Sequence, residues 1–212
     1  MSGTKSVPDT ELGPKHIALL VIDMQNDFCS DQGVYGRSGF SRQLVQAMAR
    51  RLERFLKTAR EVGISLIHTK TVHSEWTDNP VWLSREGGKF SHQTCRFGSW
   101  GAEWFEDFPG IWPKEGEYTV IKHRNSAFLS TDLELVLKSK EIRSLIVTGT
   151  ATNSCVEATA RDAFMRGYNV TVVSDCTATS PESAHSNTLE RLQGSGILLR
   201  SSSEITDYWK KI

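Results

Sequence analysis

A cysteine in the second half of the chain has the setting of a catalytic nucleophile. Cys155 follows an apolar run at residues 145–148 and a short turn that begins at Gly149, and a segment with helical periodicity continues after it. In an open parallel α/β sheet, ligands bind beyond the carboxyl ends of the strands, where this residue is expected. A helix N-terminus there is expected to lower the pKa of the thiol. The alternative is a small buried hydrophobe, the usual role of a free cysteine.

Two charged residues stand at the ends of other apolar runs. Asp23 follows residues 17–22, and Lys122 follows residues 118–121. If all three strands end at one edge of a sheet, the carboxylate can accept the thiol proton and the ammonium can stabilise the resulting anions. The thiolate of Cys155 can then attack a carbonyl carbon. Asp23 could instead cap a strand or form a structural salt bridge, and its position alone does not decide between these roles.

The elements that must position these residues alternate along the chain. Strands are predicted at residues 17–22, 64–68, 118–121, 145–148, 169–173 and 197–199, and helices at 42–61, 131–138, 155–166 and 181–193. Ser41 is the predicted N-cap of the first helix, and Gly63 lies just past its end. This alternation predicts an α/β protein, a three-layer α/β/α sandwich with a mostly parallel, doubly wound, Rossmann-like sheet.

Two stretches fall outside this alternation. Residues 69–117 have no clear period and are rich in Trp and Phe, so we expect them to build a pocket wall or a subunit contact, with a satellite core as the alternative. Residues 1–15 are polar and contain Pro and Gly, which predicts a flexible N-terminal arm. Residues 16–212 are then a single domain.

The composition favours a small molecule as the binding partner. The chain has 25 Lys and Arg against 25 Asp and Glu and no long block of one charge, which favours neither nucleic acid nor an anionic membrane. It shows no signal-peptide pattern and no run of eighteen apolar residues, so a cytoplasmic location is expected. The four cysteines include no CxxC pair, which indicates free thiols rather than disulfides or a zinc cluster. No cofactor is expected.

Three motifs in the chain resemble those of the isochorismatase-like cysteine hydrolases. They are DMQNDF at Asp23 to Phe28, IKHRNSAF at Ile121 to Phe128 and VTGTATNSCVEATARDAF at Val147 to Phe164, in the family's order and spacing. The family includes nicotinamidases, N-carbamoylsarcosine amidohydrolases, ureidoacrylate amidohydrolases and biuret hydrolases. The resemblance covers about residues 16–200 and implies the three-layer fold.

The resemblance also implies roles for individual residues. Asp23 would be the base, Lys122 its cationic partner and Cys155 the nucleophile. A cis peptide bond is implied between Thr150 and Ala151, and the N–H groups of Ala151 and Cys155 would form the oxyanion hole.

The candidate substrate-binding residues are Phe28, Arg124 and Thr150. The resemblance places Phe28 in the aromatic wall of the pocket, and Thr150 lies at the implied cis bond. Arg124 stands two residues past Lys122 and shares its face if the strand continues that far, where it could hold a substrate carboxylate. The alternative is a surface or interface arginine.

The chain departs from the metal-binding members of the family. Nicotinamidases hold a metal with an Asp-x-His motif and a further His, and the matching segment here begins with Thr71 and ends with His73. No metal site is therefore expected, and His73 is either a hydrogen-bonding residue of the pocket or a surface residue.

These observations predict a cysteine-dependent amidohydrolase that cleaves a C–N bond of a small amide, carbamoyl or ureido compound through a thioester intermediate. One alternative is a vinyl ether hydrolase of the isochorismatase type, which does not need the thiol of Cys155. Another is a non-catalytic α/β binding module. A homo-oligomer, a dimer or a tetramer, is also expected.

Overall fold

A six-stranded, all-parallel sheet forms the centre of the molecule. The computed structural model describes residues 14–85, 90 and 92–211. The strands are β1 (Ile17–Ile22), β2 (Ser65–Thr71), β3 (Tyr118–Lys122), β4 (Ser144–Thr150), β5 (Asn169–Ala178) and β6 (Leu198–Arg200). They pair in the order β3-β2-β1-β4-β5-β6. The chain therefore runs outward from β1 in both directions, which confirms the predicted doubly wound α/β fold.

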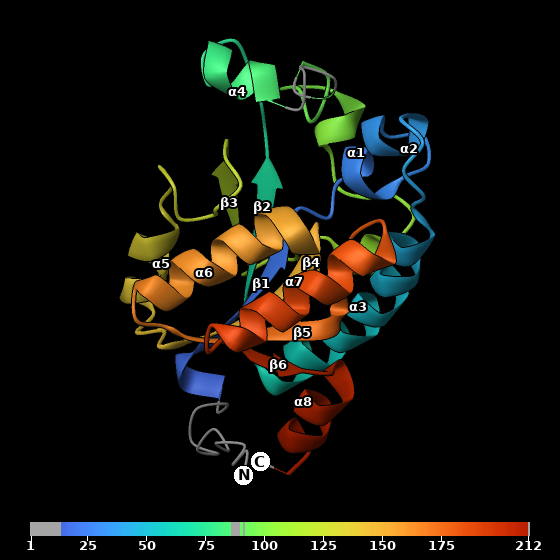
Figure 1. Cartoon of the computed structure of the whole chain (residues 1–212). Helices are drawn as coiled ribbons and strands as arrows, with labels where there is room; N and C mark the ends of the chain where they lie inside the picture. Colours follow the sequence, from blue (N-terminus) through green and yellow to red (C-terminus); the bar gives the residue numbers. More distant parts are fainter. Residues whose placement is uncertain (1–13, 86–89, 91, 212) are drawn as a thin grey trace.

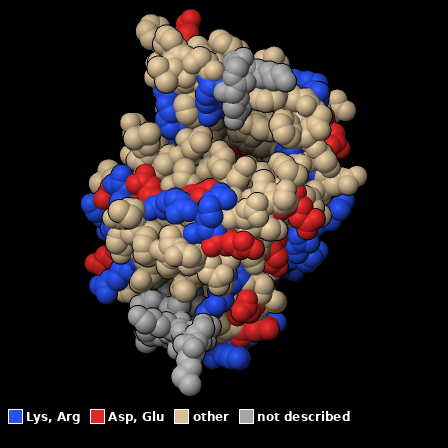
Figure 2. Space-filling view, in the orientation of Figure 1, with Lys and Arg blue, Asp and Glu red and all other residues tan. Residues whose placement is uncertain are grey.

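The carboxyl ends of the strands face one end of the molecule. Figure 1 shows the arrowheads of β1, β2 and β3 directed toward the end that carries α1 (Asn26–Cys29), α2 (Val34–Arg37) and α4 (Pro80–Ser84). Positive and negative side chains are interspersed over the face shown in Figure 2, in keeping with the balanced charge of the chain.

Helices cover both faces of the sheet, and β1 is therefore buried on both sides. One core cluster contains Leu19 and Val21 of β1, and the other contains Leu20 and Ile22. The first cluster includes residues of α3 (Gln43–Val62) and α8 (Ser202–Trp209), whereas the second includes residues of α5 (Leu133–Ser139), α6 (Glu157–Met165) and α7 (Glu182–Gly194). Successive strand residues point to opposite faces, so a continuous apolar run supplies both cores.

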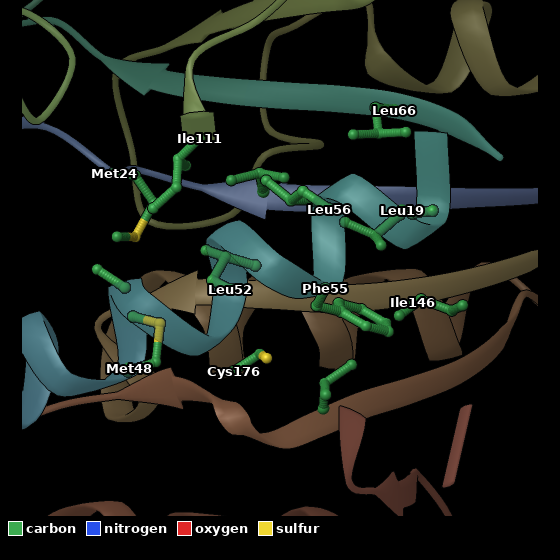
Figure 3. Packing of buried hydrophobic residues seen from close by; sticks show 14 of the residues in the cluster. Leu19, Met24, Met48, Leu52, Phe55, Leu56, Leu66, Ile111, Ile146 and Cys176 are labelled. Atoms are coloured by element: carbon green, nitrogen blue, oxygen red, sulfur yellow. The ribbon is translucent and has the colours of Figure 1, made fainter. Parts of the chain in front are cut away.

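The long helix α3 supplies most of one core. Its buried residues recur at the helical period, and Figure 3 shows Met48, Leu52, Phe55 and Leu56 against Leu19 and neighbouring strands. Gly63 ends the helix with φ 81°, in the left-handed conformation that glycine adopts most readily.

The start of α3 and the C-terminal end of the chain differ from the prediction. The N-cap position is Arg42 rather than Ser41, and the Arg42 side chain forms no capping hydrogen bond, although Ser41 Oγ accepts one from the Gln43 N–H at 3.4 Å. Helix α8 was not predicted, although its start has a local signature in Ser201 and Glu204, which form a capping box.

The aromatic-rich residues 69–117 contain short elements instead of one irregular loop. The end of β2, α4 and the two 3₁₀ turns Trp100–Ala102 and Pro109–Ile111 lie in this stretch. Phe105 and Ile111 are buried in the α3 core, whereas Trp76 and Phe97 are exposed. The buried part of this stretch therefore extends the hydrophobic core, in keeping with the alternative expectation of a satellite core.

The predicted N-terminal arm falls mainly on residues 1–13, which lie outside the described residues. Pro14–His16 form a 3₁₀ turn that leads into β1. All four cysteines are free thiols. Within residues 14–85, 90 and 92–211, no helix combines the length and apolar character needed to cross a membrane.

Candidate active site

The order of the strands brings the three predicted catalytic side chains to one edge. Lys122 is the last residue of β3, and Asp23 follows β1 directly. Cys155 lies in the π-helical turn Thr152–Val156, which connects β4 to α6. Strands β1 and β4 are neighbours, and only β2 separates β1 from β3.

Asp23, Lys122 and Cys155 are in contact with one another. Lys122 Nζ lies 2.7 Å from Asp23 Oδ2 and 3.4 Å from Cys155 Sγ. The charge of the Asp23 carboxylate also acts on the Cys155 thiol and raises its pKa. Asp23 and Lys122 are fully buried, and Cys155 is 9% exposed, so the cysteine is the member that a ligand can reach.

Two threonines of β2 hold the carboxylate in place. Thr69 Oγ1 donates a hydrogen bond to Asp23 Oδ1 at 2.7 Å, and Thr71 Oγ1 donates to Asp23 Oδ2 at 2.9 Å. Thr71 Oγ1 also accepts a hydrogen bond from Lys122 Nζ at 2.7 Å. The sequence reasoning did not assign these roles, although the spacing of two residues in a strand places both threonines on one face.

Burial and charge act in opposite directions on Lys122. Burial by itself would lower the pKa of its ammonium, but the charges of Asp23 and Cys155 and their hydrogen bonds outweigh this effect and raise the pKa. The ammonium also donates to the main-chain carbonyl of Arg124 at 3.0 Å. A buried lysine that gains these partners stays protonated at neutral pH.

The expectation of a lowered pKa for Cys155 is wrong. The pKa of the thiol is raised to about 11, because burial, the largest cause, and the Asp23 carboxylate together outweigh the opposing charge of Lys122. The helix N-terminus was the local reason for the prediction, but desolvation of the thiolate is the larger effect here. Cys155 therefore rests as a thiol beside a carboxylate that can accept its proton.

The turn after β4 is tightly packed against β1. Gly149 has φ 105°, and a Cβ atom there would lie 2.1 Å from the carbonyl oxygen of Ile22, so only glycine fits. The peptide bond between Thr150 and Ala151 is cis. Thr150 Oγ1 donates a hydrogen bond to the Ala178 carbonyl of β5 at 3.1 Å, which ties the turn to the neighbouring strand.

A cavity of about 380 Å³ opens above this turn. Its lining includes Cys155, Lys122, Thr150 and Ala151, together with the predicted pocket residue Phe28. The other aromatic residues of the lining are Tyr35, Phe40, Trp82 and Phe90. Figure 2 shows a hollow on this face, beneath the end of the molecule that carries α4. Trp82 and Phe90 confirm that the aromatic-rich stretch 69–117 contributes a pocket wall.

Arg124 lines the same cavity, although the reasoning that placed it there does not hold. Strand β3 ends at Lys122, so the alternation of a strand does not extend to Arg124. Its guanidinium donates to the carbonyls of His123 at 2.6 Å and Thr77 at 3.0 Å and lies 4.7 Å from the ring centre of Trp82. Main-chain carbonyls, rather than a strand, therefore position this side chain.

His73 is a residue of the cavity rather than of the surface. It is 2% exposed, and its Nδ1 lies 2.9 Å from Asp78 Oδ1, while Arg96 contacts the other oxygen of the same carboxylate. Burial lowers the pKa of His73 to about 4, against the opposing effect of Asp78, so the imidazole is neutral at pH 7.

The donors near His73 do not make a metal site of the nicotinamidase type. Thr71 occupies the carboxylate position, and its hydroxyl is engaged with Asp23 and Lys122. Among residues 14–85, 90 and 92–211, no group of three or more His, Cys, Asp and Glu side chains could hold a metal ion. Zinc sites need three or four such ligands.

Comparison with known proteins places this geometry among hydrolases. The isochorismatase domain family matches residues 17–204. Ureidoacrylate amidohydrolase RutB of Caulobacter vibrioides is 31% identical over 177 residues, which cover 77% of each protein. The structure of an isochorismatase-like hydrolase from Alkaliphilus metalliredigens superimposes with a TM-score of 0.74 at 29% identity, covering 91% of this chain and 98% of the other. The structure of N-carbamoylsarcosine amidase from Thermoplasma acidophilum superimposes with a TM-score of 0.70 at 25% identity, covering 88% of this chain and 96% of the other.

Proposed function

Because the chain belongs to the isochorismatase family, we propose that it is a cysteine-dependent amidohydrolase acting on a C–N bond of a small amide, carbamoyl or ureido compound. Its similarity to RutB and to N-carbamoylsarcosine amidase supports hydrolysis of C–N bonds in linear amides. The observation that carries the proposal is the set of contacts between Asp23, Lys122 and Cys155 at the floor of a cavity.

The first step forms a bond between Cys155 Sγ and the carbonyl carbon of the substrate. As this bond forms, the thiol proton moves to the Asp23 carboxylate, which is held beside the thiol by Lys122. The carbonyl oxygen becomes an oxyanion, which we assign to the N–H groups of Ala151 and Cys155 at the tight turn. A protonated resting thiol fits this step, because a base within reach removes the need for a preformed thiolate.

The second step breaks the C–N bond and completes the cycle. Asp23 returns its proton to the leaving nitrogen, which departs as ammonia or an amine and leaves a thioester on Cys155. A water molecule then gives a proton to Asp23 as its oxygen attacks the thioester carbon. The C–S bond breaks, and the sulfur recovers the proton, so one water is consumed for each C–N bond cleaved.

Lys122 and the cavity residues assist without entering the covalent chemistry. The ammonium of Lys122 balances the carboxylate and lies close to the sulfur where negative charge develops. We propose that Phe28, Thr150 and Arg124, which line the cavity, contact the substrate. The amide, carbamoyl or ureido group then lies above the turn with its carbonyl carbon near Cys155.

An ammonia-release screen over ureidoacrylate, N-carbamoyl amino acids, nicotinamide and biuret tests this proposal. We expect one class to be hydrolysed, Cys155→Ala to abolish turnover, and intact-protein mass spectrometry to detect a hydroxylamine-labile adduct on Cys155. The buried core variant Cys176→Ala is the matched control and should retain activity. Turnover of a vinyl ether that survives Cys155→Ala would favour the ether hydrolase. Absence of turnover, with no substrate adduct, would favour the binding module.

We also propose that the protein forms a dimer or a tetramer. Large apolar side chains remain exposed near α4, with Trp76 90%, Val81 81% and Phe97 80% exposed. We infer that these side chains form an apolar surface of the kind that marks protein interfaces. Light scattering coupled to size-exclusion chromatography measures the mass directly, and a single species of about 24 kDa would contradict the proposal.

A further inference from the structure

Arg42 is a buried cation that forms no ion pair with a carboxylate of the described residues. It is 5% exposed, and its Nε and Nη1 donate to the carbonyls of Phe40 at 3.0 Å and Phe28 at 2.8 Å. Burial lowers the pKa of its guanidinium, and the charge of Asp31, which forms no ion pair with it, only partly opposes this effect. A buried charge is costly unless it is paired, so an anionic ligand would stabilise this arginine.

An anionic ligand that pairs with Arg42 has room in the cavity above Cys155. Arg42 belongs to the cavity lining, and none of the described lining residues is Asp or Glu. Its Nη2 donates no hydrogen bond to any residue that the structure describes. The carbonyls of Phe28 and Phe40 fix the plane of the guanidinium, so a carboxylate would meet a donor that is already oriented.

The wall beside Arg42 is a group of four aromatic rings. Tyr35 and Phe90 are stacked at 5.5 Å, with an interplanar angle of 19°. Phe28 and Phe40 both contact Tyr35, at 5.5 and 5.8 Å between ring centres. The Arg42 guanidinium lies 5.8 Å from the ring centre of Tyr35. An anionic group paired with Arg42 would therefore have an aromatic surface next to it, which favours an apolar substituent on the same ligand.

We propose that the substrate carries a carboxylate that pairs with Arg42 and an aromatic or bulky apolar substituent that packs against Phe28, Tyr35, Phe40 and Phe90. This inference rests on the proposed amidohydrolase function and narrows its substrate to amides or carbamoyl derivatives of such acids. The scissile carbonyl and the carboxylate occupy different parts of one cavity, so a molecule larger than urea or biuret is required to reach both.

Arg42 is a better carboxylate anchor than Arg124. Arg124 is only partly buried, so water screens its charge, and both of its terminal nitrogens already donate to main-chain carbonyls. Arg42 is nearly inaccessible to water and keeps one terminal nitrogen without a partner among the described residues. Charge-assisted hydrogen bonds are strongest where water is excluded.

A binding experiment tests the inference separately from catalysis. Titration calorimetry on Cys155→Ser would compare N-carbamoylphenylalanine with its neutral carboxamide and with N-carbamoylglycine. We expect the acid to bind at least tenfold more tightly than the carboxamide, the size of one charge-assisted hydrogen bond. We expect N-carbamoylglycine, which lacks the ring, to bind at least tenfold more weakly than N-carbamoylphenylalanine.

Two variants of Arg42 assign the effect to that residue. Arg42→Gln should remove the preference for the acid and leave binding of the carboxamide nearly unchanged, and Arg42→Lys should keep part of the preference. Arg37→Gln on α2 is the matched control, because Arg37 is exposed and lies outside the cavity lining. A circular dichroism melt verifies the fold of each variant, and Arg42→Lys serves if Arg42→Gln does not fold.

Several results would overturn the inference. One is equal binding of the acid and the carboxamide by the protein with Arg42 intact. Another is a preference for the acid that persists in Arg42→Gln. A third is a preference for the acid that is lost in Arg124→Gln instead. Tight binding of the acid without hydrolysis by the protein with Cys155 intact would instead count against the proposed function. The two failures are therefore distinguishable.

Discussion

Replacing Asp23 with Asn should make Cys155 more reactive toward an alkylating agent while it abolishes hydrolysis. The carboxylate raises the pKa of the Cys155 thiol through its negative charge. The Asn side chain removes the charge but keeps the shape, so the Lys122 ammonium, 3.4 Å from the sulfur, then favours the thiolate unopposed. Turnover is lost because Asn cannot accept the thiol proton.

The structure sets the size of the effect. With a thiol pKa of about 11, roughly one molecule in a thousand is a thiolate at pH 8. Removing a like charge in direct contact raises that fraction about tenfold to a hundredfold. The change also breaks a buried ion pair between Asp23 and Lys122, which costs about 3 to 5 kcal/mol of stability. The melting temperature should then fall by about 6 to 20 °C for a chain of this length.

The assay is the rate of iodoacetamide labelling at Cys155, followed by peptide mass spectrometry from pH 7 to 10. In the unmodified protein the rate should rise about tenfold with each pH unit, because the thiolate fraction does. Cys29, Cys95 and Cys176 are fully buried, and burial raises the pKa of each of their thiols more strongly, so they should be labelled later.

Asp207→Asn is the matched control for the Asp23 experiment. Asp207 is exposed on α8 and pairs with Lys210, so this variant should change neither labelling nor turnover. Slower or unchanged labelling of Cys155 in folded Asp23→Asn would refute the reasoning, because the carboxylate would then not be the group that keeps the thiol protonated. Rapid labelling of the unmodified protein at pH 7 would contradict the raised pKa itself.

Four further outcomes are expected. Thr71→Val removes a charge-assisted hydrogen bond from the Asp23 carboxylate, the proposed base, so kcat should fall about tenfold to a hundredfold with little change in KM. Treatment with a chelator should leave activity intact, and zinc-dependent recovery of lost activity would contradict this. Gly149→Ala should cost at least about 2 kcal/mol in urea unfolding, because its Cβ would collide with the β1 backbone. Burial alone would raise the pKa of Glu117, but hydrogen bonds from His68 and Arg60 lower it to about 2 from 4.5. Its contribution to stability is complete above about pH 4.5 and is lost as the pH falls toward 2, so melting temperatures of Glu117→Gln and the unmodified protein should converge over that interval.

The sequence by itself determined the fold class and the place of the three central residues. The alternation of apolar strand runs with helices admits a parallel sheet whose carboxyl ends share one edge. Asp23 and Cys155 follow a strand closely and Lys122 is the last residue of one, and a local pattern locates such strand ends to within a few residues. Their proximity therefore followed from topology before any side chain was placed, whereas their catalytic roles stay a proposal.

Only the tertiary structure decided how these groups ionise and what surrounds them. The helical setting of Cys155 indicated a lowered pKa, but segments distant in the sequence bury its thiol and raise that pKa. Thr71 and Arg42 look like ordinary strand and loop residues, and their partners lie on other elements. Desolvation and the pairing of charges depend on packing between distant segments, and no local period records that packing.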